Sequence, residues 1–224
     1  MKKAFTMLEL VFVIVVVGIL SYMVASSFTR NPLREAADQV VSHIRYTQHL
    51  AMMDDRFMDS ELVNPVNWFK TRWQIFFSNG DDTNNQWSYT IFSDKLGNHT
   101  GNPDPIEVAI NPLAPEKRLT GGANGANIIH TGDAEATSEM NIGIEYGVLN
   151  VELNTNCRIG ASQKISFDYL GRPLRGAPNG YTSPYPAANR LISNRCEITL
   201  TNATGDNIII AIEPETGYTH ILPN

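Results

Sequence analysis

The sequence lacks most of the groups from which an active site is usually built. Only two of its 224 residues are cysteine, and its five histidines never form the His-Glu-x-x-His pattern of zinc enzymes. Neither a Gly-x-Ser-x-Gly elbow nor a phosphate-binding glycine loop occurs. We therefore expect no catalytic residues, no bound metal and no cofactor.

The chain also lacks a concentration of positive charge. No run of Lys and Arg is longer than two residues, and 17 basic against 23 acidic residues give a formal net charge of −6. Phosphate contacts need clustered Lys and Arg. Nucleic acid therefore remains a possible partner, but the composition does not support it.

Charge is scarcest at the N-terminus. Between Phe5 and Phe28 only Glu9 is charged, and a helix of that length would measure about 36 Å, enough to cross the apolar core of a bilayer. A carboxylate at the centre of a membrane costs about 2.5–3.5 kcal/mol. Cleavage between Ala4 and Phe5 would create an α-amine near Glu9, and this amine would give the carboxylate a charge partner.

The first nine residues resemble the leader of type IV pilins and pseudopilins. The resemblance implies that prepilin peptidase cleaves between Ala4 and Phe5, that Phe5 is then N-methylated, and that Glu9 acts in assembly by neutralising a neighbour's N-terminal amine. Ala4 stands where the family usually has glycine. The matching residues are Lys2, Lys3, Ala4, Phe5, Thr6 and Glu9.

Two other interpretations of the N-terminus stay open. Residues 24–26, Val-Ala-Ser, could be the cleavage site of an ordinary secretory signal peptide. A plain uncleaved anchor is the other. The apolar run is long for a signal peptide, and a helical pattern continues beyond it without a break.

Residues 31–58 have the pattern of an amphipathic helix. Arg34 and Asp38 are four residues apart on the polar face, which predicts an ion pair. Pro32 removes a backbone donor and predicts a kink or a break. The apolar stripe, which we expect to pack on a sheet, consists of Leu33, Ala36, Ala37, Val40, Val41, Ile44 and Ala51.

Beyond residue 59 the sequence is typical of β-structure. Residues 69–77 and 86–93 are rich in aromatic and β-branched side chains, and the turn residues 79–85 separate them, so a hairpin is predicted. The oxygen-rich turn could instead bind calcium, but no Glu completes an EF-type loop.

Further strands are predicted from short apolar segments, and two proline-rich segments are predicted as long surface loops. The loops are 97–125 and 172–189, and disorder is an alternative for the second. The C-terminal third is predicted to end in a three-stranded antiparallel meander. The other predicted strands are 127–130, 140–146, 148–153 and 162–168.

Residues 165–173 and 210–218 look like the C-terminal half of the H-type minor pseudopilins of type II secretion. In that family these segments build the sheet, so the resemblance implies structural roles here for Phe167, Gly171, Arg172 and Gly217. The two glycines are expected to need positive φ, and Arg172 is a candidate structural anchor.

The two cysteines, Cys157 and Cys196, allow one pairing. In an exported domain a disulfide is expected, and a bridge closing about 40 residues would stabilise the fold by about 4 kcal/mol. Free buried thiols are the alternative.

Together these features predict an α+β protein in which a long N-terminal membrane-spanning helix packs on a mostly antiparallel β domain. We expect a leader over residues 1–4, a transmembrane half-helix over 5–30, an amphipathic half over 31–58 and a periplasmic β-rich domain over 59–224. The expected location is the bacterial inner membrane, crossed once, with the C-terminal domain in the periplasm.

The resemblance implies a structural protein rather than an enzyme. It would be a minor pseudopilin, or a related subunit, of a type II secretion or type IV pilus-type filament. The implied partners are other pilins or pseudopilins, prepilin peptidase and an inner-membrane assembly platform. The alternative is a membrane-anchored binding module for DNA uptake or adhesion that uses the two long loops.

Overall fold

The computed structural model describes residues 6–27, 31–54, 67–96, 99–123, 125, 128–184 and 190–223. The chain divides into two compact units, Met1–Asn31 and Pro32–Asn224, here called the N-terminal unit and the globular unit. Over the described residues the fold is α+β, with three α-helices and antiparallel sheets. The α+β class is therefore as expected, but the membrane-spanning element of the expected fold is not found.

Helix α1, Met7–Ser27, belongs to the N-terminal unit. Within the part of the chain that the structure describes, no helix is long and apolar enough to span a membrane. The expected membrane-spanning helix over 5–30 and the expected single-pass inner-membrane location are therefore corrected, because neither is supported.

Helix α2, Pro32–Met53, opens the globular unit. Pro32 is its first residue, a position where the missing N–H and the fixed φ of proline fit the start of a helix. The predicted break at Pro32 is therefore found, and the amphipathic segment belongs to the globular unit. Arg34 Nε donates to Asp38 Oδ2 over 3.1 Å, so the predicted ion pair is also confirmed.

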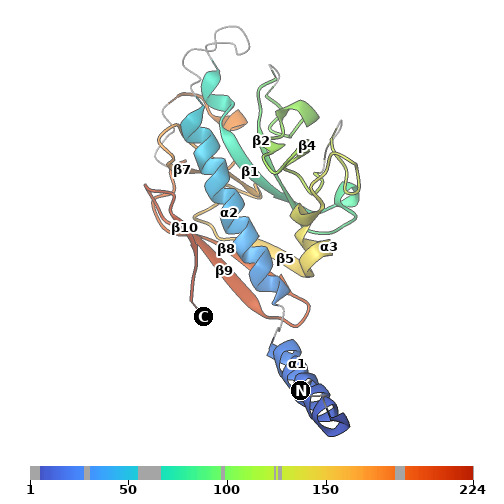
Figure 1. Cartoon of the computed structure of the whole chain (residues 1–224). Coiled ribbons are helices and arrows are strands. Elements are labelled where there is room, and N and C mark those ends of the chain that lie inside the picture. Colours follow the sequence, from blue (N-terminus) through green and yellow to red (C-terminus); the bar gives the residue numbers. More distant parts are fainter. Residues whose placement is uncertain are drawn as a thin grey trace. The chain divides into compact units, whose positions relative to one another are not determined.

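All seven residues of the predicted apolar stripe of α2 are buried, together with Thr47. Figure 1 shows α2 running along the globular unit, where it contacts strands of both four-stranded sheets. The stripe forms one core with the inward side chains of those sheets, such as Ile75, Ile165 and Ile210. The predicted packing of this helix on β-structure is confirmed.

The first sheet has the strand order β2-β1-β6-β7. Strands β1 (Trp73–Ser78) and β2 (Ser88–Ser93) form the predicted antiparallel hairpin, in which Ile75 faces Ile91. Strands β6 (Lys164–Phe167) and β7 (Pro173–Arg175) continue the sheet. The turn between β1 and β2 is closed by Thr83, whose Oγ1 donates to the carbonyl of Gln86 over 2.8 Å.

The second sheet has the order β10-β9-β8-β5 and is also antiparallel. Its strands are β5 (Val148–Leu153), β8 (Cys196–Asn202), β9 (Asn207–Ile212) and β10 (Thr219–Ile221). The predicted strand 148–153 and the predicted C-terminal meander are both confirmed. Strands β10 and β5 are its two edges.

The segment between β2 and β5 differs most from the prediction. The expected irregular region 97–125 contains a small hairpin, β3 (Ile110–Asn111) with β4 (Ala114–Arg118). The strand predicted over 140–146 is wrong, because Ile142–Tyr146 is helix α3. No strand occurs in the described part of 127–130 either.

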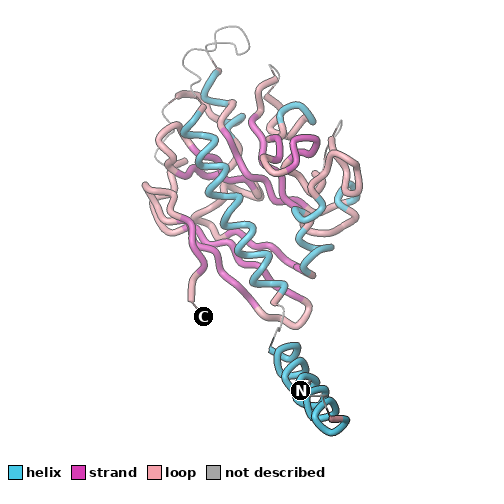
Figure 2. The backbone as a smooth tube through the Cα atoms, viewed as in Figure 1, coloured by secondary structure: helices cyan, strands magenta, loops and turns pink. Residues whose placement is uncertain are grey.

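Loops make up most of the remaining chain, as Figure 2 shows. Within the second predicted loop, 172–189, the described residues include β7, and residues 185–189 lie outside the described part. Single turns of 3₁₀ helix occur at Trp68–Lys70, Asp81–Thr83, Pro105–Glu107, Ser138–Met140 and Pro178–Gly180.

Candidate functional site

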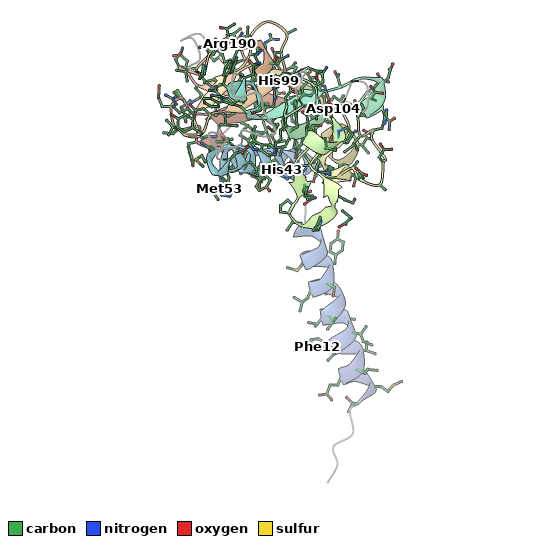
Figure 3. All side chains as sticks on the ribbon, turned by 90° about the horizontal axis from the view of Figure 1, so that it is seen from above. Phe12, His43, Met53, His99, Asp104 and Arg190 are labelled. Atoms are coloured by element: carbon green, nitrogen blue, oxygen red, sulfur yellow. A yellow bond between two sulfur atoms is a disulfide. The ribbon has the colours of Figure 1, made fainter. Side chains whose placement is uncertain are left out.

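Helix α1 is apolar on every side and exposes its large side chains. Their exposed fractions range from 38% at Val16 to 83% at Met7 and Leu8. The side chain of Phe12 projects outward from the helix in Figure 3. A helix that is hydrophobic all round is normally buried in its working state. The side chains of α1 therefore form a surface on which another apolar element can pack.

Glu9 lies in the first turn of α1. Thr6 precedes the helix, and the backbone N–H of Glu9 donates to Thr6 Oγ1 over 3.3 Å and to the Thr6 carbonyl over 3.1 Å. The sequence Thr6-Met7-Leu8-Glu9 thus has the spacing of a capping box, and a carboxylate is favourable at a helix N-terminus. Glu9 therefore has a local reason to be at this position, in addition to the expected role in assembly.

The expected cleavage junction, between Ala4 and Phe5, lies outside the described residues. The same holds for the expected methylation of Phe5. The first described residue, Thr6, caps α1, which begins at Met7.

The turn that contains Gly171 and Arg172 is organised by the buried carboxylate of Asp168. Its Oδ1 accepts the backbone N–H groups of Leu170 (3.0 Å) and Arg172 (2.9 Å), and its Oδ2 accepts Nε of Arg172 over 2.8 Å. The Asp168 carboxylate raises the pKa of Arg172. Phe167, immediately before the turn, is fully buried. Arg172 is thus anchored to the turn, as expected.

Gln48 of α2 joins this turn to the turn before β10. Its Nε2 donates to the carbonyls of Gly171 and Thr216, both over 2.8 Å. Gly171 and Gly217 have φ values of 79° and 64°, so the expected positive φ is found at both. A Cβ on Gly217 would lie 2.6 Å from Gln48 Nε2 and 2.7 Å from the backbone carbonyl oxygen of Gly171, and because backbone cannot move aside as a side chain can, this glycine is also required by the close approach.

These contacts form a structural junction between α2, the β6–β7 turn and the β9–β10 turn. The sequence patterns did not identify Gln48 or Asp168 as part of it. Asp168 had a recognisable signal, since Asp three residues before Gly is common in turns. Gln48 had none, because its partners are far away in sequence.

Cys157 and Cys196 form a disulfide, as predicted, with their Cα atoms 4.7 Å apart. Both are fully buried. The bridge joins Cys157, in the connection that follows β5, to Cys196, the first residue of β8. Strands β5 and β8 are themselves paired in the second sheet. The disulfide therefore adds a covalent link at the β8–β5 end of the second sheet.

A polar network joins α2 to β2 and α3. Tyr146 OH donates to Gln39 Oε1 over 2.6 Å, and Gln39 Nε2 donates to Tyr89 OH over 2.8 Å. Tyr89 OH lies 2.6 Å from His43 Nδ1 and can donate to it, because burial lowers the pKa of His43 to about 4 and keeps the ring neutral. Burial also raises the pKa of Tyr89.

The loop after β2 is held by buried charges. Asp94 Oδ2 accepts the N–H of Gly101 over 2.6 Å, while Lys164 Nζ donates to the Gly101 carbonyl and lies 4.3 Å from the centre of the Phe76 ring. Burial raises the pKa of Asp94 to about 6 and lowers that of Lys164 to about 8. Asp94 Oδ2 and Lys164 Nζ thus bind the backbone of this loop within the fold.

No family model, curated protein or solved structure matches the chain. Among the described residues there is no group of three or more His, Cys, Asp or Glu side chains that could hold a metal ion. The candidate functional site therefore consists of α1, with its exposed apolar surface and the carboxylate of Glu9.

Proposed function

We propose that the chain is a structural subunit of a pilin-like filament and assembles through α1. The observation that carries this proposal is the exposure of apolar side chains on every side of that helix between Met7 and Met23. In this proposal α1 packs against the α1 helices of other subunits, which are copies of this chain or other pilins or pseudopilins. The type II secretion filament and the type IV pilus are the two machines that the N-terminal sequence favours.

The energetic argument is that α1 has no packing partner among the described residues of its own unit. Fully burying one Val, Leu or Ile side chain contributes about 1.5–3 kcal/mol, and soluble monomers rarely expose an apolar patch larger than a few hundred Å². Mutual burial of several such helices would therefore provide a strong drive for association. The apolar stripe of α2, in contrast, is already buried within the globular unit.

Glu9 would give this association its register. An apolar helix alone does not define how far one helix slides along another, whereas a buried charge pair does. In the proposed filament the Glu9 carboxylate lies beside the α-amine of a neighbour's Phe5, which becomes available once prepilin peptidase has removed residues 1–4. The Thr6 cap begins α1 close to that new terminus.

The test compares Glu9→Gln with Glu9→Asp in the full chain, expressed with the processing enzyme and partner pilins. Gln is accepted at this position of a capping box, so Glu9→Gln removes the charge and keeps the cap. We expect Glu9→Gln to lower the amount of the chain in sedimented filaments by at least about tenfold. Glu9→Asp keeps the charge and should give an intermediate value.

The matched control is Glu35→Gln, the same chemical change in the first turn of α2, which should assemble like the unchanged chain. Intact mass of the filament material should show a terminus at Phe5 carrying one added methyl group. A terminus near residue 26 would overturn the proposal. Normal assembly of Glu9→Gln would show that Glu9 only caps the helix.

A further inference from the structure

A groove lies between α2 and the edge strand β10 of the globular unit. It has a volume of about 360 Å³. Val41 and Ile221 give it an apolar part, and Arg34 and Arg45 are the basic residues that line it. Protein interfaces combine apolar side chains with polar ones, and arginine is enriched among them, so the lining of this groove fits a protein-docking surface.

The positive charge of the groove is only partly neutralised. Arg34 pairs with Asp38 over 3.1 Å. The guanidinium of Arg45, in contrast, donates from Nε and Nη2 to the backbone carbonyl of Thr219, over 3.0 and 2.6 Å, and a carbonyl carries no charge. His220 faces the carboxylate of Glu213 at 3.1 Å. An acidic partner would therefore find an attractive field at Arg45.

The opposite edge of the same sheet has the complementary composition. Residues 131–153 contain no Lys or Arg. Glu152 on β5, Glu145 on α3 and Glu139 in the turn Ser138–Met140 are exposed and take part in none of the ion pairs of the described residues. Helix α3 contacts both that turn and β5. Ile144 of α3 and Leu149 of β5 are 51% and 58% exposed. These five residues are called the acidic face.

The groove and the acidic face belong to opposite edges of the second sheet. The order β10-β9-β8-β5 places two strands between the edges, a separation of about 14 Å at about 4.8 Å per strand. Figure 1 shows β10 on one side of α2, and β5 and α3 on the other. One copy cannot fill its own groove with its own acidic face, so a contact between these surfaces joins two copies.

We propose that the groove between α2 and β10 receives the acidic face of a second copy of this chain. The two surfaces differ, so the contact is head to tail and leaves a free groove and a free acidic face at the ends. Such a heterologous contact repeats into an open helical array unless its rotation closes a ring.

This inference rests on the proposed function and names the second contact between its subunits. The groove is too small to form a stable interface alone, since stable interfaces bury about 800 Å² on each partner. Association through α1 raises the local concentration of neighbouring globular units, and a weak contact then becomes effective. The α1 contact drives assembly, and the groove contact orients the globular units.

The first experiment exchanges the charges in the full chain. Arg45→Glu and Glu145→Arg should each lower the yield of sedimented filaments by about threefold to tenfold, because each places like charges opposite each other. The double variant Arg45→Glu/Glu145→Arg should recover most of the yield. Glu116→Arg, at an exposed residue of β4, is the matched control and should have no effect.

A second experiment avoids the charge reversal, so it does not require the fold to tolerate Arg45→Glu or Glu145→Arg. Arg45→Lys keeps the positive charge and supplies an amine that a carbodiimide can couple to a carboxylate. In filaments mixed from isotopically labelled and unlabelled copies, we expect cross-links from position 45 to Glu145, Glu139 or Glu152 that join the two kinds of copy.

The outcomes separate the two proposals. Filaments of normal yield in both single variants, without the expected cross-links, overturn the groove contact and leave assembly through α1 intact. If the unchanged chain forms no filaments, assembly through α1 fails. The cross-link experiment on the concentrated full chain in detergent then decides the groove contact by itself, and absence of the cross-link overturns it.

Discussion

The helices α1 and α2 are almost equal in length, 21 and 22 residues, but they differ in where their apolar side chains go. Those of α2 form one stripe that is buried against both sheets, and its other face is polar. Those of α1 surround the helix and are exposed. The stripe of α2 is therefore used in folding, whereas the surface of α1 is available for association.

This difference separates the effects of substitutions. A change in the stripe of α2 should alter the free energy of unfolding of the globular unit. A change in α1 should leave that free energy unchanged and alter assembly. The three tryptophans, at positions 68, 73 and 87, all lie in the globular unit, so their fluorescence reports the unfolding of that unit alone.

The largest effect is expected from Ile→Asp in the stripe of α2, and the same substitution in α1 is the comparison. Ile44 is fully buried, and Ile44→Asp would bury an unpaired carboxylate, which costs at least about 5 kcal/mol, comparable to the whole stability of a domain. The globular unit should not fold. Ile14 is 62% exposed, and Ile14→Asp should leave the tryptophan-monitored urea midpoint unchanged. Equal midpoints for both variants would remove the distinction between the two helices.

The disulfide should have the next largest effect, again restricted to the globular unit. The bridge Cys157–Cys196 closes a sequence separation of 39 residues, and the chain-entropy model assigns about 4 kcal/mol to such a loop. The double variant Cys157→Ser/Cys196→Ser should lose about that much in urea unfolding. Dithiothreitol should lower the stability of the unchanged chain but not of the variant. An equal response of both to dithiothreitol would contradict a structural disulfide.

The junction that holds α2 should be more sensitive than an open turn. Gly217→Ala would impose strain at φ 64° and place its Cβ 2.6 Å from Gln48 Nε2, so we expect a loss of about 2–4 kcal/mol. Gly205 has φ 86°, and a Cβ at that position would have no other atom within 4 Å, so Gly205→Ala should cost only about 1 kcal/mol. Similar losses in urea unfolding would show that the close approach of Gln48 and the Gly171 carbonyl to Gly217 does not contribute.

The sequence predicted buried residues correctly where a single periodic pattern corresponds to a single buried face. All seven stripe residues of α2 follow from helical periodicity, because burial on a core selects that period. The strand 148–153 is predicted from its short apolar segment and not from alternation. The junction could not be predicted in this way. Gln48 resembles any polar helix residue, and its partners Gly171 and Thr216 come from two distant turns.

Helix α3 shows a different kind of error. Residues 140–146 contain β-branched and aromatic side chains that favour a strand. The ends decide against it: Asn141 Oδ1 accepts the N–H of Ile144 over 3.1 Å, and Gly147 terminates the helix with φ 68°. Asn before and Gly after a short segment are cap signals that sequence reasoning could have used.

The smallest effect, and the most specific, concerns the half-buried His43 and the buried Asp94, whose pKa values are shifted in opposite directions. Burial lowers the pKa of His43 from 6.5 to about 4. Between these values the unfolded state binds the proton and the folded state does not, so the stability that His43 contributes rises with pH. Burial raises the pKa of Asp94 from 3.8 to about 6. There the folded state binds the proton, and its contribution falls as pH rises.

The two slopes should therefore offset each other between about pH 4 and pH 6, each being at most about 1.4 kcal/mol per pH unit. His43→Gln keeps an acceptor for Tyr89 and removes the rising part, so its stability relative to the unchanged chain should fall as pH rises. Asp94→Asn should show the opposite trend. Urea unfolding at pH 4, 5 and 6 measures both differences, and the trends should be equally present when α1 carries Ile14→Asp. Parallel curves for the two variants would mean that burial does not set these pKa values, whereas a change caused by Ile14→Asp would mean that α1 affects the folding of the globular unit.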